Sequence, residues 1–228
     1  MTSSTPTYEF FASCGAGLEH ILADELRDAG AIRLRPLKSG VSFEGTLEAG
    51  YRALLWTRTA SRIQLVLDRV PAGNADILYE SIHSIDWTEQ IREGSTISIS
   101  ARGVNAAMRN PQFTEQKVKD AVCDMMRERT GARPDVDTRH PGLLIDVGIH
   151  DAKATVAIDL AGTPLFKRGY RAGKREAVSP LRETVAAALL LAADWPRLAA
   201  EGCPFVDPFC GSGTIPIEAA LIARNIAP

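Results

Sequence analysis

The chain has few cysteines and no long apolar run, and each shortage excludes a class of protein. Its 228 residues include four cysteines, which lack the short paired spacing of a zinc site or a redox dithiol. They are Cys14, Cys123, Cys203 and Cys210. No stretch approaches the roughly eighteen uninterrupted apolar residues of a membrane-spanning helix, and the first residues do not resemble a secretion signal. We therefore expect a protein of the reducing cytoplasm, without a disulfide framework, a metal or a membrane partner.

The sequence also lacks an excess of positive charge. Lys and Arg number 26 against 28 Asp and Glu, which gives a formal net charge of −2. A uniformly basic nucleic-acid binder is thereby excluded, so any contact with phosphates has to come from local clusters of Lys and Arg. The hydrophobic share of 45% is ordinary for a chain that folds around a core.

The hydrophobic pattern predicts a mixed α/β chain. The first part reads β-α-β-α-β over residues 8–13, 17–29, 41–44, 47–56 and 62–70. The second part continues the mixed pattern with a segment over 77–85, a helix over about 113–129, and strands over 95–100, 143–149 and 154–160, the last two joined by a turn. On the long helix, an inward stripe is predicted for Val118, Val122, Met125 and Met126, with the Met pair as core filler.

Residues 167–175 form a basic run with five positive charges and no acid. Composition leaves two interpretations open, a solvated connector or an ordered loop that contacts nucleic acid. Tyr170 within the run favours the second, because an aromatic face can stack on a base. Beyond the run, Ser179 and Pro180 predict the start of a helix that Trp195 and Pro196 end.

A glycine-rich turn carries the clearest chemical signal. Residues 203–206 predict a short buried strand, which leads through Asp-Pro-Phe-Cys-Gly-Ser-Gly-Thr at 207–214 into a last helix. A strand, a tight turn and a helix in this order are typical of nucleotide-like cofactor sites, since Gly211 and Gly213 allow the ligand close to the backbone. Asp207 is placed to accept hydrogen bonds from a cationic amine.

Three nucleotide-binding interpretations compete for this turn. A P-loop needs a lysine after its glycine, and Thr214 follows Gly213 here. A dinucleotide loop needs a third glycine where Pro216 stands. The remaining interpretation is S-adenosylmethionine, which is not a phosphate ester. The alternative is that the glycines serve only the turn and Asp207 caps the helix. Cys210 has no histidine near it in sequence, so we expect a packing residue and not a nucleophile.

At this point the residues resemble the THUMP-containing methyltransferases that modify guanine N2 in RNA, particularly the bacterial large-subunit ribosomal RNA enzymes. The resemblance covers most of the chain. It is carried by residues 11–15 (FASCG), 109–113 (RNPQF), 117–122 (KVKDAV), 133–137 (RPDVD), 167–171 (KRGYR), 180–184 (PLRET) and, most specifically, the glycine loop with 215–220 (IPIEAA).

The resemblance implies a fold and a domain order. Residues 1–45 are expected to form a ferredoxin-like N-terminal subdomain and 46–160 a THUMP domain that binds structured RNA. Residues 161–179 are then a basic linker, and 180–228 the incomplete start of a Rossmann-like methyltransferase domain. The fold class is α/β with α+β parts.

The resemblance also implies site residues and partners. The S-adenosylmethionine pocket is expected to be lined by Asp207, Phe209, Gly211 and Gly213, with Asp207 facing the methionine amino group. Structured RNA, above all ribosomal RNA, is the expected partner, and it would be bound through phosphates and shape rather than sequence. The predicted RNA-binding residues are Arg109, Lys117, Lys119, Lys167, Arg168 and Arg171.

The sequence departs from the family at the catalytic tetrad. Asn-Pro-Pro-Tyr or a similar tetrad, which would hold the flipped guanine, does not occur in the chain. The resemblance implies that the parent protein methylates guanine N2 in RNA. Because the tetrad is missing, we expect the chain as given to bind RNA without turnover. Two alternatives stay open, a non-catalytic RNA-binding or assembly module and a transfer RNA guanine-N2 methyltransferase. A DNA adenine methyltransferase is further off, because it would not need the THUMP part.

Overall fold

The computed structural model describes residues 6–170 and 181–228, which fall into two compact units. Unit 1 comprises Met1–Gln64 and Thr163–Pro228, and unit 2 comprises Leu65–Gly162. The boundary between Gln64 and Leu65 lies inside one strand, β4 (Arg62–Pro71). The chain thus leaves unit 1 through β4 and returns to it after Gly162.

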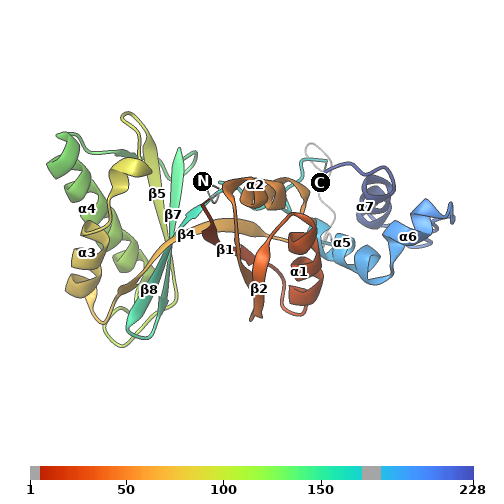
Figure 1. Ribbon diagram of the computed structural model, residues 1–228, viewed down its shortest axis with the longest axis horizontal. Coiled ribbons are helices and arrows are strands. Elements are labelled where there is room, and N and C mark those ends of the chain that lie inside the picture. The colour runs from red at the N-terminus through yellow and green to blue at the C-terminus, as the bar shows by residue number, and fades with distance from the viewer. Residues whose placement is uncertain (1–5, 171–180) are drawn as a thin grey trace, which may run out of the picture. The chain divides into compact units, whose positions relative to one another are not determined.

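The N-terminal part of unit 1 is a βαββαβ arrangement (Figure 1). Its elements are β1 (Tyr8–Ser13), α1 (Glu19–Asp28), β2 (Ile32–Leu37), β3 (Gly40–Gly45), α2 (Leu47–Trp56) and the start of β4. The strands lie in the order β2-β3-β1-β4, and β1 and β3 are antiparallel with Phe10 opposite Phe43. The rings of Phe10 and Phe43 are stacked with centroids 5.0 Å apart, and both side chains are buried.

Local chemistry sets the helix ends in this part. The Thr46 hydroxyl accepts from the Ala49 N–H and so caps α2, as expected of an N-cap threonine. After α1, Gly30 takes a φ of +93°, and its N–H donates to the Arg27 carbonyl. This left-handed glycine ends the helix, as glycine commonly does just after a last helical turn. Gly50 allows α2 to approach β1, since a Cβ there would lie 2.5 Å from the Phe10 ring.

The C-terminal part of unit 1 contains α5 (Glu183–Ala192), α6 (Trp195–Ala200) and α7 (Thr214–Ala223). Trp195 joins two of these helices, because its indole N–H donates to the Ala219 carbonyl at 2.9 Å and its side chain is buried. The predicted helix start at Ser179 lies outside the described residues, and the described helix begins at Glu183. The prediction that Trp195 and Pro196 only end a helix is incomplete. They also begin α6. Pro196 lies in the first turn of this helix, where a residue without an N–H costs no hydrogen bond.

The predicted strand at 203–206 is wrong. The structure shows no strand over these residues, and the Val206 side chain is 79% exposed. An apolar run becomes a buried strand only when neighbouring strands satisfy its backbone hydrogen bonds. No other strand is described within residues 181–228, so the run has no such neighbour there.

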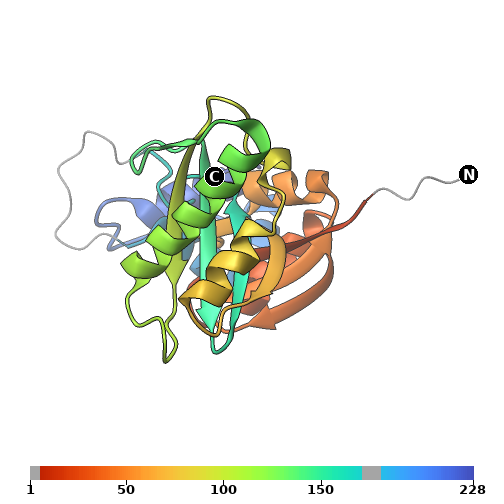
Figure 2. The same cartoon turned by 90° about the vertical axis from the view of Figure 1, so that its left-hand side faces the viewer.

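Unit 2 is a sheet with helices against one face. Its elements after β4 are α3 (Ala75–His83), the 3₁₀ turn η1 (Trp87–Glu89), β5 (Thr96–Arg102), α4 (Pro111–Thr130), β6 (Asp135–Val136), β7 (Leu143–His150) and β8 (Lys153–Asp159). The strand order is β4-β8-β7-β5-β6, with β7 and β8 as an antiparallel hairpin and β5 parallel to β7. Figure 2 shows α3 and α4 side by side in front of these strands.

The inward stripe predicted for α4 is confirmed. Val118, Val122, Met125 and Met126 are all buried in the core of unit 2, so the Met pair is core filler as expected. Asn110 caps the helix by accepting from the Gln112 N–H, and Gly131 ends it with a φ of +78°. No helix in the described part of the chain is long and apolar enough to cross a membrane.

Candidate functional site

Residues 207–214 form a tight turn that leads directly into α7. Gly211 and Gly213 have φ values of +53° and +79°, in the left-handed region that glycine tolerates best. The Gly213 N–H donates to the Cys210 carbonyl at 2.7 Å, and Gly213 is the residue before the first turn of α7. A Cβ on either glycine would meet nothing closer than 3.9 Å. The backbone of the turn is therefore open to a ligand on its glycine side.

The first turn of α7 offers hydrogen-bond donors. The N-cap residue of α7 is Gly213, which has no side chain to cap the helix. The first N–H groups of any α-helix have no acceptor within the helix itself. The positive end of the helix dipole lies at the same place. Together these features favour a bound carboxylate or another anion.

Asp207 supplies an acceptor in the same turn. Its Oδ1 accepts from the Phe209 N–H at 3.1 Å, and its Oδ2 is buried without a hydrogen-bond partner among the described residues. Asp207 therefore does not cap α7, which was the alternative interpretation of this residue. A buried, unpartnered carboxylate oxygen is costly, and a ligand ammonium group would satisfy it. Donors and an acceptor within one turn fit the carboxylate and ammonium groups of an amino acid moiety.

Two side chains of the turn project into solvent. Phe209 is 93% exposed, and Cys210 is exposed as well. The prediction of Cys210 as a packing residue is therefore wrong, because the turn has no core on that side in the described residues.

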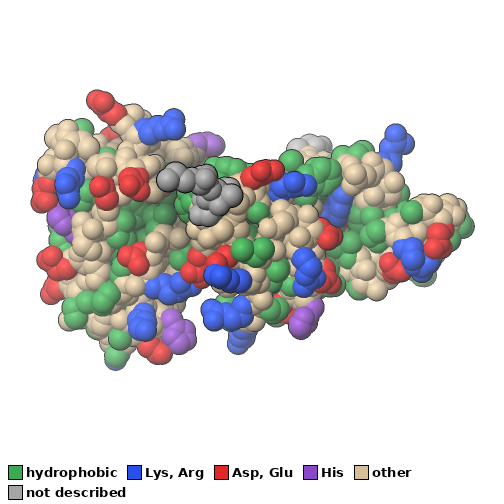
Figure 3. All heavy atoms as spheres, in the orientation of Figure 1, with side chains coloured by type: hydrophobic (Ala, Val, Ile, Leu, Met, Phe, Trp, Pro, Cys, Tyr) green, Lys and Arg blue, Asp and Glu red, His purple; other side chains and the backbone are tan. Residues whose placement is uncertain are grey.

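The predicted RNA-binding residues of unit 2 lie on α4 and just before it. Arg109 is exposed, and its Nε donates to the Ala106 carbonyl at 3.3 Å. Lys117 has its Nζ 3.6 Å from an Asp76 carboxylate oxygen, and the Lys119 Nζ is 2.8 Å from one on Asp120. The two lysines are thus partly neutralised by acids. On the face displayed in Figure 3, Lys and Arg side chains are likewise interspersed among Asp and Glu.

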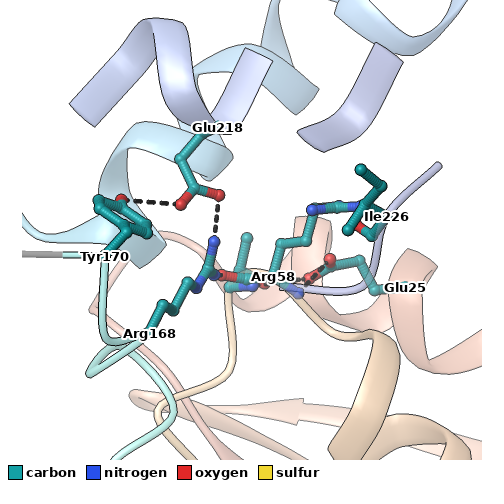
Figure 4. Close-up of polar contacts among 7 residues, drawn as sticks. Glu25, Arg58, Arg168, Tyr170, Glu218 and Ile226 are labelled. Atoms are coloured by element: carbon teal, nitrogen blue, oxygen red, sulfur yellow. Dashed lines mark hydrogen bonds and ion pairs between the residues drawn. The ribbon is translucent and has the colours of Figure 1, made fainter. Parts of the chain in front are cut away.

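The structure places the cations of the basic run at 167–175 in different environments. Lys167 is exposed and Arg171 lies outside the described residues. The Arg168 side chain is only 3% exposed and forms an ion pair with Glu218 of α7 (Figure 4). The Tyr170 hydroxyl donates to the other Glu218 oxygen at 2.9 Å. The prediction that Arg168 contacts RNA is wrong, because its guanidinium is buried and paired within the protein. Tyr170 likewise directs its hydroxyl to Glu218 and not to solvent.

Sequence reasoning missed the buried charges of unit 1. Glu218 is completely buried, Arg58 is 7% exposed, and burial raises the pKa of Glu25 above its ordinary value. A signal for Glu218 was present, since it lies three residues after Ile215 and four before Ile222, on the apolar face of the helix. A charge on an apolar helix face calls for a buried partner.

Models of three protein families match successive parts of the chain. They are the RlmL ferredoxin-like domain over residues 9–64, the THUMP domain over 72–159 and the RMKL-like, methyltransferase domain over 168–228. The chain belongs to the THUMP-containing RNA methyltransferase family. The predicted family and the predicted fold class are thereby confirmed.

Curated relatives of the THUMP-containing family are much longer than this chain. A ribosomal RNA large subunit methyltransferase K/L from Magnetococcus marinus is 46% identical over 221 residues, and the one from Pseudomonas aeruginosa is 41% identical over 221 residues. Each alignment covers 97% of this chain and 30% of the relative. The chain therefore spans 30% of the length of these relatives.

Solved structures of similar proteins agree with the fold. A putative methyltransferase, SMU.472, solved in complex with SAH, has a TM-score of 0.85 and 32% identity over 99% of this chain and 58% of its own. A predicted N6-adenine-specific DNA methylase from Listeria monocytogenes has a TM-score of 0.84 and 33% identity over 98% of this chain and 57% of its own. Both are similar to this chain across units 1 and 2.

Proposed function

We propose that the protein carrying this chain transfers the methyl group of S-adenosylmethionine to guanine N2 in structured RNA, above all large-subunit ribosomal RNA. The observation that supports this proposal is the turn at 207–214, where an Asp207 oxygen is buried without a hydrogen-bond partner among the described residues, shortly before the N-terminus of α7. The names of the curated relatives support ribosomal RNA as the substrate. The chain itself lacks the catalytic tetrad, so it is assigned RNA binding without turnover.

The residues of the turn divide the work of holding the cofactor. The Asp207 Oδ2 would accept from the ammonium group, and N–H groups of the first turn of α7 would donate to the carboxylate. Gly211 and Gly213 keep the backbone free of side chains at the point of contact. Phe209 is kept in the proposed cofactor site as an exposed ring at its edge. When bound, S-adenosylmethionine supplies an electrophilic methyl group on a sulfonium centre. The contribution of the protein would be to hold this methyl donor and an extruded base in position for the transfer.

The RNA side of the proposal rests on exposed cations. Arg109 in unit 2 and Lys167 in unit 1 are exposed, whereas Lys117 and Lys119 would first have to give up their acidic partners. Contacts of this kind bind phosphates and weaken as salt is raised. Arg171 stays in the proposal on sequence alone.

The domain boundaries and the location in the cell also belong to the proposal. We assign residues 9–64 to the ferredoxin-like subdomain and 72–159 to the THUMP domain, because α2 and the start of β4 complete the βαββαβ part of unit 1. The boundary expected between residues 45 and 46 would divide that part. Residues 161–179 as a linker and 180–228 as the start of the methyltransferase domain stay in the proposal. The protein is placed in the cytoplasm, where its ribosomal RNA substrate is made and no disulfide is needed.

Methyl transfer from labelled cofactor tests the reaction. The full-length protein is incubated with labelled S-adenosylmethionine and, separately, ribosomal RNA from cells lacking the protein, transfer RNA and duplex DNA. Label on guanine N2 of the ribosomal RNA is the expected result. Label on transfer RNA alone, on DNA, or on no nucleic acid would overturn the substrate assignment.

A matched pair of variants tests the cofactor site. Asp207→Asn keeps the shape of the side chain and removes its charge, so the affinity for S-adenosylhomocysteine should fall by about tenfold or more. Asp194→Asn changes an exposed aspartate before α6 and should leave the affinity as it is. Equal affinities for the two variants in titration calorimetry would refute the role given to Asp207.

A further inference from the structure

A buried polar cluster in unit 1 connects α7 to the N-terminal βαββαβ part. We propose that Arg168 is a positioning residue, which holds α7 and the glycine turn in the orientation that the cofactor requires. The N-terminal part would thereby set the geometry of the methyl-donor site. This inference rests on the proposed function.

One guanidinium group makes both halves of the connection. The Arg168 Nη1 pairs with Glu218 in α7, and its Nη2 donates to the backbone carbonyl of Arg58 in the N-terminal part (Figure 4). The Tyr170 hydroxyl donates to the second oxygen of Glu218 at 2.9 Å. The Arg168 and Glu218 side chains are 3% and 0% exposed. Both oxygens of this carboxylate are therefore fixed by partners that lie outside its own helix.

A second arginine holds the far end of α7. The Nη2 of Arg58 donates to the carbonyl of Ile226 at 2.6 Å, three residues beyond the last residue of the helix, Ala223. Arg58 therefore acts on α7 twice, through its own side chain and through the carbonyl that receives Arg168. A helix anchored near its middle and just after its end cannot tilt without breaking one of the two contacts.

The N-terminal anchor is itself held in place. Glu25 of α1 accepts from the backbone N–H of Arg58 at 2.6 Å, from the N–H of Thr59 at 3.1 Å and from the Thr59 hydroxyl. The N–H of Leu165 donates to the carbonyl of Ser61 at 2.9 Å, so the segment that carries Arg168 runs along the same loop. The chain of contacts therefore leads from α1 through residues 58–61 to Arg168 and on to α7.

The physical character of the pair favours positioning over stability. Burial removes water from both charges, and this cost offsets much of their attraction, so a buried pair adds little to stability compared with well-packed apolar residues. Its geometry is nevertheless demanding, because any shift of α7 leaves a buried charge unpaired. Glu218 lies about one and a half helical turns from Gly213, so a displacement at Glu218 carries the glycine turn with it.

The test replaces the pair by apolar residues in the full-length protein. Arg168→Met together with Glu218→Leu keeps the volume and removes both charges, so the protein should fold and melt near the wild-type temperature. Affinity for S-adenosylhomocysteine should fall by about tenfold, whereas affinity for ribosomal RNA should stay as in the wild type. The split between cofactor affinity and melting temperature identifies positioning, because a merely structural role would move both.

The chain offers a matched control on α6. Arg197 and Glu201 form an ion pair at 2.7 Å with both side chains more than half exposed. Arg197→Met together with Glu201→Leu makes the same chemical change away from the turn and should leave cofactor affinity unchanged.

A conservative variant covers the case in which the double variant does not fold. Arg168→Lys keeps the charge, but a single ammonium is poorly suited to bridge Glu218 and the Arg58 carbonyl as the guanidinium does, so cofactor affinity should fall by about threefold. Wild-type affinity in a folded Arg168→Met with Glu218→Leu protein, or in Arg168→Lys, would overturn the inference alone. A wild-type protein that does not bind S-adenosylhomocysteine would overturn the proposed function and this inference with it.

Discussion

Replacing Glu218 by alanine should destabilise α7 far more than any surface change in the same part of unit 1. The substitution leaves the Arg168 guanidinium, 3% exposed, without its counter-charge, and it removes the acceptor of the Tyr170 hydroxyl. Removal of one partner from a buried ion pair costs about 3–5 kcal/mol. The free-energy cost of losing the acceptor of the Tyr170 hydroxyl is included in that range, because contributions within one hydrogen-bond network are not additive.

An exposed ion pair supplies the reference for this prediction. Glu201→Ala removes one of the two acidic partners of Arg197 and leaves the other, Asp194. The Glu201 and Arg197 side chains are 53% and 56% exposed. Exposed pairs of this kind contribute about 0–1 kcal/mol. The expected difference between Glu218→Ala and Glu201→Ala is therefore about 2 kcal/mol or more.

Amide hydrogen exchange measures the effect where it occurs. Peptides from α7 in Glu218→Ala should exchange about a hundredfold faster than in the wild type, which corresponds to a loss of about 3 kcal/mol in the free energy of opening. Peptides from α4 lie in unit 2 and serve as an internal reference that should not change. Equal exchange of α7 in Glu218→Ala and Glu201→Ala would refute the account of the buried pair.

Two further predictions concern backbone geometry and thiol reactivity. Gly103→Ala should cost unit 2 at least about 2 kcal/mol in urea unfolding, because φ is +77° and the new Cβ would lie 2.1 Å from the Ile149 carbonyl oxygen. Gly94→Ala has nearly the same φ, +76°, with no atom within 4 Å, and should cost only about 1 kcal/mol, so equal losses would contradict the packing argument. Burial and two nearby glutamates raise the pKa of Cys14 from 9.0 to about 11. At pH 8 only about one Cys14 thiol in a thousand is ionised, so iodoacetamide should modify the exposed Cys203 first, and the Cys14 rate should rise with pH towards 11. Early Cys14 labelling in mass spectrometry would count against that burial.

Local sequence signals determined the elements that need no distant partner. The stripe at Val118, Val122 and Met125 predicted the buried face of α4, because helical periodicity depends on near neighbours alone. Gly211 and Gly213 predicted a tight turn before a helix for the same reason, since only their own backbone angles are involved. The edge strand β2 escaped prediction, because its arginines, its proline and its exposure hide the alternation of a strand.

Only the tertiary structure decided which charges are buried and what they bind. Arg168 and Lys167 are adjacent cations in the sequence, yet one is paired inside unit 1 and the other is exposed. Arg168 is separated from Glu218 by 50 residues, and Arg58 from Ile226 by 168, so no local pattern connects them. The strand predicted at 203–206 is absent for a related reason, because a strand forms only where a neighbouring strand accepts and donates its backbone hydrogen bonds. Periodicity and turn chemistry are properties of neighbours along the chain, whereas desolvation and pairing depend on which segments folding brings together.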